Sequence, residues 1–99
     1  MPSYRVAISK RAVRDIDLIS DQTIERWGKH QAKRYVAAIR SDIESLATSP
    51  NRFPRHEGRH LTLRRMRSAH HFVFYRVEGN DVIVIRILHE RMNFESRMP

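Results

Sequence analysis

The sequence contains no cysteine, and this absence excludes several kinds of chemistry at once. A chain without thiols has no disulfide framework, no thiolate zinc site and no cysteine nucleophile. Long apolar runs are also missing, since the stretch from Val6 to Ile8 is far too short for a signal sequence. Nothing approaches the roughly 20 apolar residues of a membrane span. We therefore expect a cytoplasmic protein with no role in a membrane.

Acidic residues are scarce relative to basic ones. The 99 residues include 19 Lys and Arg against 11 Asp and Glu, a formal net charge of +8. Net charge is informative about partners rather than about fold, and most of these cations are arginines, which favour planar contacts with phosphate or carboxylate. The composition predicts a single domain, residues 1–99, that binds a macromolecule rather than processing a small metabolite.

Two kinds of periodicity divide the first half of the chain. Tyr4, Val6 and Ile8 alternate with other residues, as in a short strand with one buried face. Ser9 is a suitable N-cap for the helix that follows, and Gly28 suits the left-handed conformation at its end. Two amphipathic helices joined at this glycine predict an antiparallel hairpin. Their apolar positions are Ala12, Val13, Ile16, Ile19, Thr23, Ile24 and Trp27, then Ala32, Tyr35, Val36, Ile39, Ile43 and Leu46.

The second half of the chain predicts strands. A loop over residues 51–60 carries Pro54 and Gly58, and a weakly patterned basic strand begins near Leu61. Residues 72–77 predict a strand, residues 78–81 a hairpin turn, and residues 82–88 a buried central strand. Residues 92–99 are expected to be a short helix or a flexible tail. The order β-α-α-β-β-β indicates an α+β fold, a small and mainly antiparallel sheet with the helix hairpin packed across one face.

Short motifs follow one another along nearly the whole chain. They are Trp27-Gly28, Gln31-Ala32 with Tyr35, Leu46-Ala47 before Pro50, Leu63-Arg64-Arg65, Phe74-Tyr75-Arg76 and Ile85-Arg86-Ile87-Leu88-His89-x-Arg91-Met92. The closing segment, a buried strand that runs into His-x-Arg-Met, is the most specific of them. In this order the motifs resemble the ParE–RelE superfamily of bacterial toxins, and the ParE branch is the closer match.

The resemblance implies the toxin of a type II toxin–antitoxin system. ParE-like toxins poison DNA gyrase by trapping it on cleaved DNA, whereas RelE-like relatives cut mRNA on the ribosome. Both are neutralised by a co-expressed antitoxin whose C-terminal segment wraps the toxin. We accordingly expect a ParD-like antitoxin in a hetero-oligomer and DNA gyrase as the target. Direct contact with nucleic acid is a secondary expectation, and no cofactor or metal is expected.

The two branches differ in the chemistry they require. Metal-independent RNA cleavage needs a group that activates the 2′-hydroxyl, cations for the phosphate and an acid for the leaving oxygen. The RelE-like pattern supplies basic residues on the sheet and a tyrosine in the C-terminal segment. In this sequence the middle-strand arginine of that pattern falls near Phe72, no tyrosine follows Tyr75, and Phe94 cannot transfer a proton. The residues favour a gyrase inhibitor with no catalytic residue of its own.

A ribosome-dependent mRNA endoribonuclease of the RelE type stays as the alternative. His70, His71 and His89 titrate near neutrality and are the substitutes for the missing tyrosine. The cations that could hold phosphate are Arg64, Arg65, Arg67, Arg76 and Arg91. A third alternative is a nucleic-acid-binding module without toxicity, although no helix-turn-helix, RNA-recognition or zinc-finger pattern supports it.

Two sets of residues are the candidate binding sites. In the basic run from Arg52 to Arg67, which includes Arg55 and Arg59, the only acid is Glu57. Such a run is either a solvated face or a binding surface. We expect the antitoxin to contact Arg64, Arg65, Arg67 and Arg76. We expect gyrase binding or toxicity to depend on His89, Arg91, Met92, Phe94 and Arg97, which otherwise only end the strand and order the tail.

The aromatic residues of the helices and of the third strand are expected to be structural. Trp27 and Tyr35 lie on apolar helix stripes, and Tyr75 alternates with Val73 and Val77. Because aromatic side chains bury a large area, packing is the expected role of all three.

Overall fold

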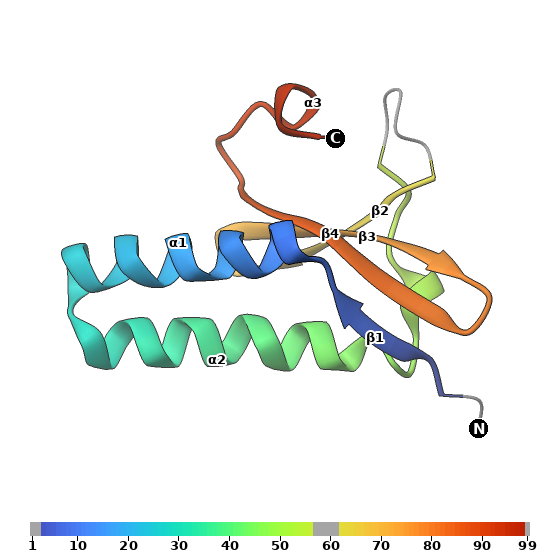
Figure 1. The fold of residues 1–99 in the computed structure, drawn as a ribbon, viewed down its shortest axis with the longest axis horizontal. Helices are drawn as coiled ribbons and strands as arrows, with labels where there is room; N and C mark the ends of the chain where they lie inside the picture. Colours follow the sequence, from blue (N-terminus) through green and yellow to red (C-terminus); the bar gives the residue numbers. More distant parts are fainter. Residues whose placement is uncertain (1–2, 57–61, 99) are drawn as a thin grey trace.

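A helix hairpin and a four-stranded sheet make up the fold, which the computed structural model describes for residues 3–56 and 62–98 (Figure 1). The elements are β1 (Arg5–Ile8), α1 (Lys10–Trp27), α2 (Lys29–Ser45), the 3-10 turn η1 (Pro50–Arg52), β2 (Arg64–Ser68), β3 (His71–Glu78), β4 (Asp81–His89) and α3 (Phe94–Arg97). This order confirms the predicted α+β class. The sequence predicted that a basic strand begins near Leu61. This start, and Gly58 in the loop before it, lie outside the described residues.

The sheet has the order β1-β4-β3-β2, which places the first strand beside the last. β1 runs parallel to β4, with Arg5 opposite Asp81 and Ile8 opposite Val84. The pairs β4–β3 and β3–β2 are antiparallel, so the sheet is mixed and mainly antiparallel, as predicted. A register shift between Phe74 and Tyr75 interrupts the β3–β4 ladder.

Two local signals fix the hairpin. The Ser9 hydroxyl caps α1 by accepting a hydrogen bond from the Ala12 N–H at 3.1 Å. Gly28 ends α1 by donating its N–H to the Ile24 carbonyl at 2.9 Å, and it does so at a φ of +90°. A side chain would strain the backbone at this φ, whereas glycine adopts it freely. The hairpin turn therefore depends on the glycine that the sequence marked.

The core lies between the helix hairpin and the face of the sheet that the hairpin covers. Fully buried side chains from α1, α2 and three strands form one cluster, which includes Ile16, Ile39, Val73 and Val84. Tyr75 belongs to this cluster, and its hydroxyl donates to the Pro50 carbonyl, which ties η1 to the sheet. Burial raises the pKa of Tyr75 to about 12, so the phenol is neutral and structural. The predicted packing role of Tyr75 is confirmed.

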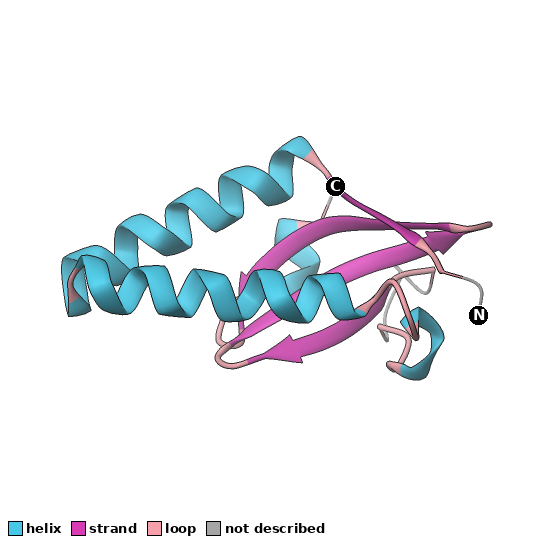
Figure 2. Ribbon diagram, turned by 90° about the horizontal axis from the view of Figure 1, so that it is seen from below, coloured by secondary structure: helices cyan, strands magenta, loops and turns pink. Residues whose placement is uncertain are grey.

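The prediction that Trp27 packs in the core is wrong. Its side chain is 70% exposed, although Ile16 and Ile19 earlier in α1 are buried. Figures 1 and 2 show the reason, because the tip of the hairpin projects beyond the end of the sheet. Trp27 is the last residue of α1 and has no strand beneath it. Ile24, one turn earlier, is 37% exposed.

The first half of α1 covers the edge of β4 that β1 leaves open. β1 pairs with β4 only as far as Val84. Beyond that point the Ser9 hydroxyl donates to the Ile85 carbonyl at 3.1 Å, and the Asp15 carboxylate accepts the Ile87 N–H at 2.9 Å. Helix side chains thus satisfy backbone groups that a neighbouring strand would otherwise bind.

None of the described helices is both long and apolar enough to cross a membrane.

Candidate functional site

A groove of about 770 Å³ lies between the tip of the hairpin and the end of the sheet where β3 begins and β4 ends. We call it the histidine groove and define it by Trp27, Tyr35, His70, His71, His89 and Arg91. The hairpin contributes the first two residues, and the two strand ends contribute the other four. The fold therefore brings together His70, His71 and His89, the three histidines that the sequence singled out.

The floor of the groove is a hydrogen-bonded pair, Tyr35 and His71. The Tyr35 oxygen accepts the His70 N–H at 3.2 Å and lies 2.7 Å from His71 Nδ1. The Tyr35 hydroxyl and His71 Nδ1 share one hydrogen bond, and the tautomer of the ring sets which of the two donates. Burial, with the neighbouring His89 and His70, lowers the pKa of His71 to about 4. At neutral pH the floor forms hydrogen bonds and carries no charge.

One side of the groove is closed by Glu90. Its carboxylate accepts from Arg67 Nη1 at 2.6 Å and from His70 Nδ1 at 2.9 Å. These two hydrogen bonds, that of Arg67 first, lower the pKa of Glu90 to about 2. The carboxylate is therefore ionised and already bound on both oxygens.

His89 stands beside His71 at the end of β4. The two rings meet edge to face with their centroids 5.1 Å apart. The Arg91 N–H donates to His89 Nδ1 at 3.2 Å, so the proton of the neutral His89 ring is on Nε2. His89 and Arg91, both predicted contact residues, line the same groove.

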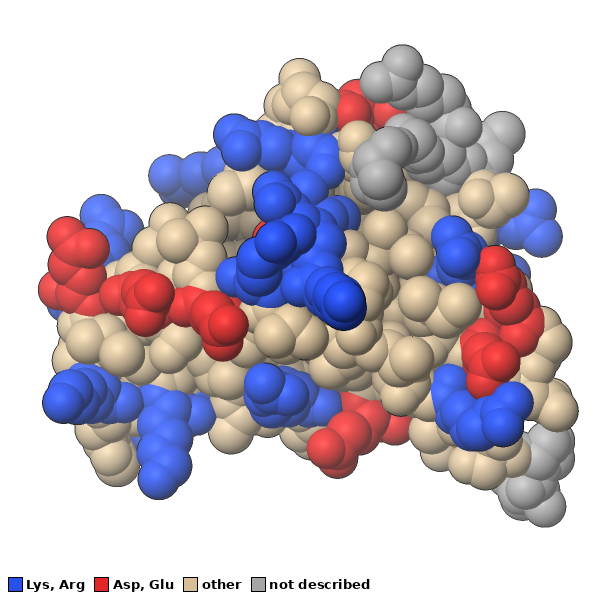
Figure 3. All heavy atoms as spheres, viewed as in Figure 1, with Lys and Arg blue, Asp and Glu red and all other residues tan. Residues whose placement is uncertain are grey.

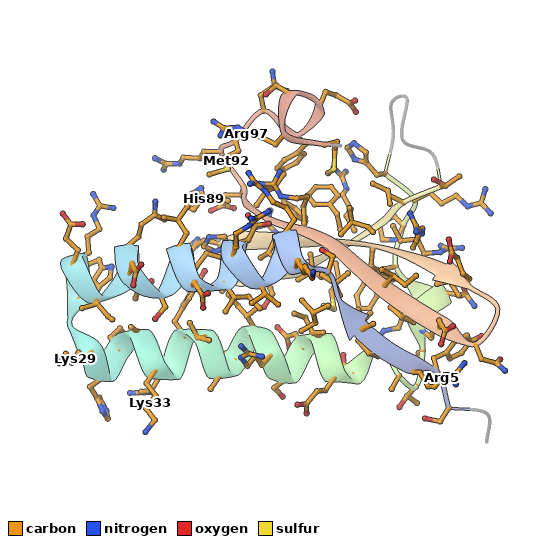
Figure 4. All side chains as sticks on the ribbon, viewed as in Figure 1. Arg5, Lys29, Lys33, His89, Met92 and Arg97 are labelled. Carbon is orange, nitrogen blue, oxygen red and sulfur yellow. The ribbon has the colours of Figure 1, made fainter. Side chains whose placement is uncertain are left out.

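The other predicted tail residues lie elsewhere. Residues 94–97 form the short helix α3, which Asn93 caps. The Phe94 ring packs on Phe74, with centroids 4.9 Å apart, on the face of the sheet away from the hairpin. Figure 4 shows Met92 and Arg97 following His89 along the C-terminal segment, and Arg97 is exposed. The five residues are thus divided between the groove, the far face of the sheet and the surface.

The four arginines predicted to bind an antitoxin also lie at different places in the fold. Arg64 donates to the Phe53 carbonyl at 2.7 Å and so holds the preceding loop. Arg65 and Arg67 lie over the Phe72 ring, 5.4 Å and 4.6 Å from its centroid, and form one basic and aromatic face. Arg76 is exposed and pairs with the adjacent Glu78. Glu57 and Arg59 of the basic run lie outside the described residues.

A second groove, of about 440 Å³, runs between α1 and α2. Ile24, Ala32 and Val36 give it an apolar floor, and Lys29 and Lys33 stand at its border. Figure 4 shows both lysines on α2 near the hairpin turn, on the side of the hairpin away from His89. The signal in the sequence was the width of the apolar stripes, which exceed what one buried face requires.

Charge is distributed unevenly over the surface. In the view of Figure 3, Lys and Arg side chains gather near the centre, where α1 begins, while acidic side chains form a row along α1.

Within residues 3–56 and 62–98, no three His, Asp or Glu side chains are grouped so that they could hold a metal ion.

Comparison with known proteins identifies the family. The family model described as ParE toxin of type II toxin-antitoxin system, parDE, matches residues 6–94, nearly the whole chain. The chain belongs to the ParE toxin family. Toxin ParE1 of Caulobacter vibrioides is 38% identical to this ParE-family chain over 98 residues, which cover 99% of each protein.

Solved structures show the same fold as this ParE-family chain. The chromosomal ParDE TA system from P. aeruginosa matches 90% of this chain and 98% of its own with a TM-score of 0.80 at 19% identity. The toxin-antitoxin complex RelBE2 from Mycobacterium tuberculosis matches 90% and 93% with a TM-score of 0.71 at 19% identity. Both the predicted fold and the predicted ParE resemblance are confirmed.

Proposed function

We propose that this ParE-family toxin inhibits DNA gyrase by binding it, and that a ParD-like antitoxin neutralises it. The observation that carries the proposal is the likeness to Toxin ParE1, which extends over 99% of both chains. The C-terminal segment supports it, because its aromatic residue Phe94 is packed against the sheet and has no proton to transfer.

The antitoxin segment that we propose is acidic and amphipathic. The groove between the helices suits such a segment, because its apolar floor of Ile24, Ala32 and Val36 is bordered by Lys29 and Lys33. An amphipathic helix places apolar side chains in a groove of this kind, and its carboxylates reach the lysines. The segment then continues to the far face of the sheet and contacts Arg65, Arg67 and Arg76 through charge-assisted hydrogen bonds. Arg64 supports this face by fixing the loop at Phe53.

The gyrase contact that we propose comes from the C-terminal segment. Its residues are His89, Arg91, Met92 and Arg97. His89 is the last residue of the rigid strand β4, and Arg91 comes two positions later. In this proposal Phe94 acts by packing the segment onto Phe74, so that the exposed residues keep one arrangement.

A RelE-type endoribonuclease is the second candidate, and the gathering of the histidines favours it. His70, His71 and His89 line one groove with the Tyr35 hydroxyl, which supplies groups able to accept and donate protons. General acid–base cleavage of RNA needs such a pair near the reacting phosphate. Arg91 in the same groove would hold that phosphate.

The deciding experiment adds the purified chain, free of antitoxin, to two reconstituted reactions. One is plasmid supercoiling by gyrase, and the other is translation of a labelled mRNA on ribosomes. Loss of supercoiling with accumulation of linear plasmid, while the mRNA stays intact, is the result we expect. Intact supercoiling with mRNA cut on the ribosome would establish the second candidate and reject the first.

The antitoxin surface is tested separately with a charge reversal. We expect Arg65→Glu to weaken binding of the cognate antitoxin about tenfold or more at low salt, because it places like charges together. Arg14→Glu, at an exposed position of α1, makes the same change in net charge and serves as the control. Equal affinities for the two variants would remove β2 from the antitoxin surface.

A further inference from the structure

The tip of the hairpin presents an aromatic surface to solvent. Trp27 is the single tryptophan of the chain, its side chain is 70% exposed, and it lines the histidine groove. Solvation of a large indole is unfavourable, so an exposed tryptophan at the border of a concave site marks a position where a ligand is able to stack.

The free charge of the groove is positive. Arg26 and Arg91 line it and are exposed, and neither has a carboxylate within salt-bridge distance in the part of the chain that the structure describes. The one carboxylate of the groove, Glu90, is bound on both oxygens by Arg67 and His70. An incoming anion therefore meets two available guanidinium groups and no free negative charge.

Apart from Ile19, the rest of the lining is polar. Gln22 and Gln31 add amide groups from the two helices to the imidazole and phenol groups of His71 and Tyr35. Amides donate and accept hydrogen bonds, as neutral imidazoles do, so the lining suits the edge of a nucleobase. A peptide of acidic residues would use the arginines and leave these groups without partners.

We propose that the histidine groove binds a short segment of single-stranded nucleic acid. A base stacks on Trp27, its edge meets the amides and imidazoles of the lining, and Arg26 and Arg91 hold backbone phosphates. Aromatic stacking combined with cations along the backbone is the general design of single-strand binding sites. The segment is single-stranded because a paired and stacked base has no free face for the indole. This proposal does not depend on gyrase or the antitoxin.

The fluorescence of Trp27 reports binding in the groove. It is recorded while the full chain is titrated with an oligodeoxythymidylate of about 12 nucleotides, with the matching oligouridylate, and with a duplex of the same length. We expect quenching that saturates with either single strand and little change with the duplex. The tighter of the two single strands identifies DNA or RNA as the source of the ligand. Saturable quenching by an oligoglutamate peptide of equal charge would overturn the proposal, since it would show that charge alone fills the groove.

Variants separate stacking from charge, with binding followed by anisotropy of a labelled single strand. We expect Trp27→Ala to weaken binding about tenfold, and Trp27→Phe to retain most of the affinity because the ring remains. Arg91→Gln should weaken binding several-fold and reduce the slope of log affinity against log salt by about 0.7. Figure 4 places Arg5 at the other end of the molecule from His89, so Arg5→Gln is the charge-matched control.

Two results would reject the proposal. One is equal affinity for Trp27→Ala, Arg91→Gln and Arg5→Gln, which would mean diffuse attraction to a basic surface. The other is a duplex that binds as tightly as the single strand. Circular dichroism and urea unfolding of each variant establish that the compared proteins are folded.

Discussion

Asp15 on α1 and Arg86 on β4 form a bidentate ion pair that is almost fully buried. Arg86 Nε lies 2.8 Å from Asp15 Oδ2 and Nη2 lies 3.1 Å from Oδ1, and each residue is 7% exposed. The same carboxylate accepts the Ile87 N–H, and the same guanidinium donates to the Arg97 carbonyl. One ion pair thus joins the first helix, the last strand and the C-terminal segment.

Removal of the carboxylate should be costly. We expect Asp15→Ala to lower the free energy of unfolding by about 3–5 kcal/mol, because it leaves a buried guanidinium without a counter-charge. Replacement of both partners, as in Asp15→Leu with Arg86→Met, should cost less than the single change. Urea unfolding of the three proteins measures both values. If Asp15→Ala lowers the free energy of unfolding by less than about 1 kcal/mol, water must solvate the Arg86 guanidinium, and the ion pair would not be buried from solvent.

Arg86→Lys tests the link to the C-terminal segment. Lysine keeps the charge but lacks the fork that reaches Asp15 and the Arg97 carbonyl together. We expect faster amide hydrogen exchange over residues 94–97, while exchange in α2 stays unchanged. Unchanged exchange in the segment would mean that the packing of Phe94 on Phe74 is enough to hold α3.

Tyr35→Phe removes the hydroxyl beneath the histidine groove. His71 Nδ1 loses its hydrogen-bond partner and the His70 N–H loses its acceptor, so we expect the free energy of unfolding in urea to fall by about 1–2 kcal/mol. Tyr4→Phe is the control, since the Tyr4 hydroxyl only accepts an exposed bond of 3.4 Å from Asn51. A loss no larger than that of Tyr4→Phe would mean that the hydroxyl does not stabilise the groove.

Stability should rise with pH across the range in which unfolded His71 titrates. The pKa of His71 is 6.5 in the unfolded chain and about 4 in the folded one, so between these values only the unfolded state binds the proton. Stability is therefore lost as pH falls from about 6.5 to 4, by at most about 1.4 kcal/mol per pH unit. We expect His71→Asn, whose amide oxygen replaces Nδ1, to flatten the profile.

The measurement for this prediction is urea unfolding of both proteins between about pH 5 and 6.5. Glu90, with a folded pKa of about 2, loses its contribution only at lower pH. Parallel profiles for the two proteins would contradict the low pKa of His71.

Local patterns were enough to predict the elements, because each depends on neighbours in sequence. Alternation at Val6 and Ile8, the Ser9 cap and the freedom of Gly28 act over a few residues and were read correctly. The exposure of Trp27 was missed, because a stripe on a helix does not reveal where the surface beneath it ends. The tip of the hairpin projects beyond the end of the sheet, and Trp27 lies at that tip.

The sites were harder to predict, because they depend on pairs that are distant in sequence. Asp15 and Arg86 are 71 positions apart, and each resembles an ordinary surface residue in its own segment. Tyr35 was expected only to pack, and its bond to His71 spans 36 positions. The histidines were recognised as titratable groups, but only the fold places a tyrosine and a tryptophan beside them.

The parallel pairing of β1 with β4 has a consequence for how the molecule is made. Arg5 and Asp81, opposite each other in this pair, are separated by 76 positions, so the sheet closes only after nearly all the chain has been synthesised. Contacts between such distant segments slow folding, because a long loop must be ordered before they form. The contacts of the α1–α2 hairpin are local in sequence, whereas the histidine groove also needs His89, Glu90 and Arg91 at the end of the last strand. The groove is therefore incomplete in a nascent chain until the last strand, which ends at His89, and the residues that follow it, Glu90 and Arg91, have been made.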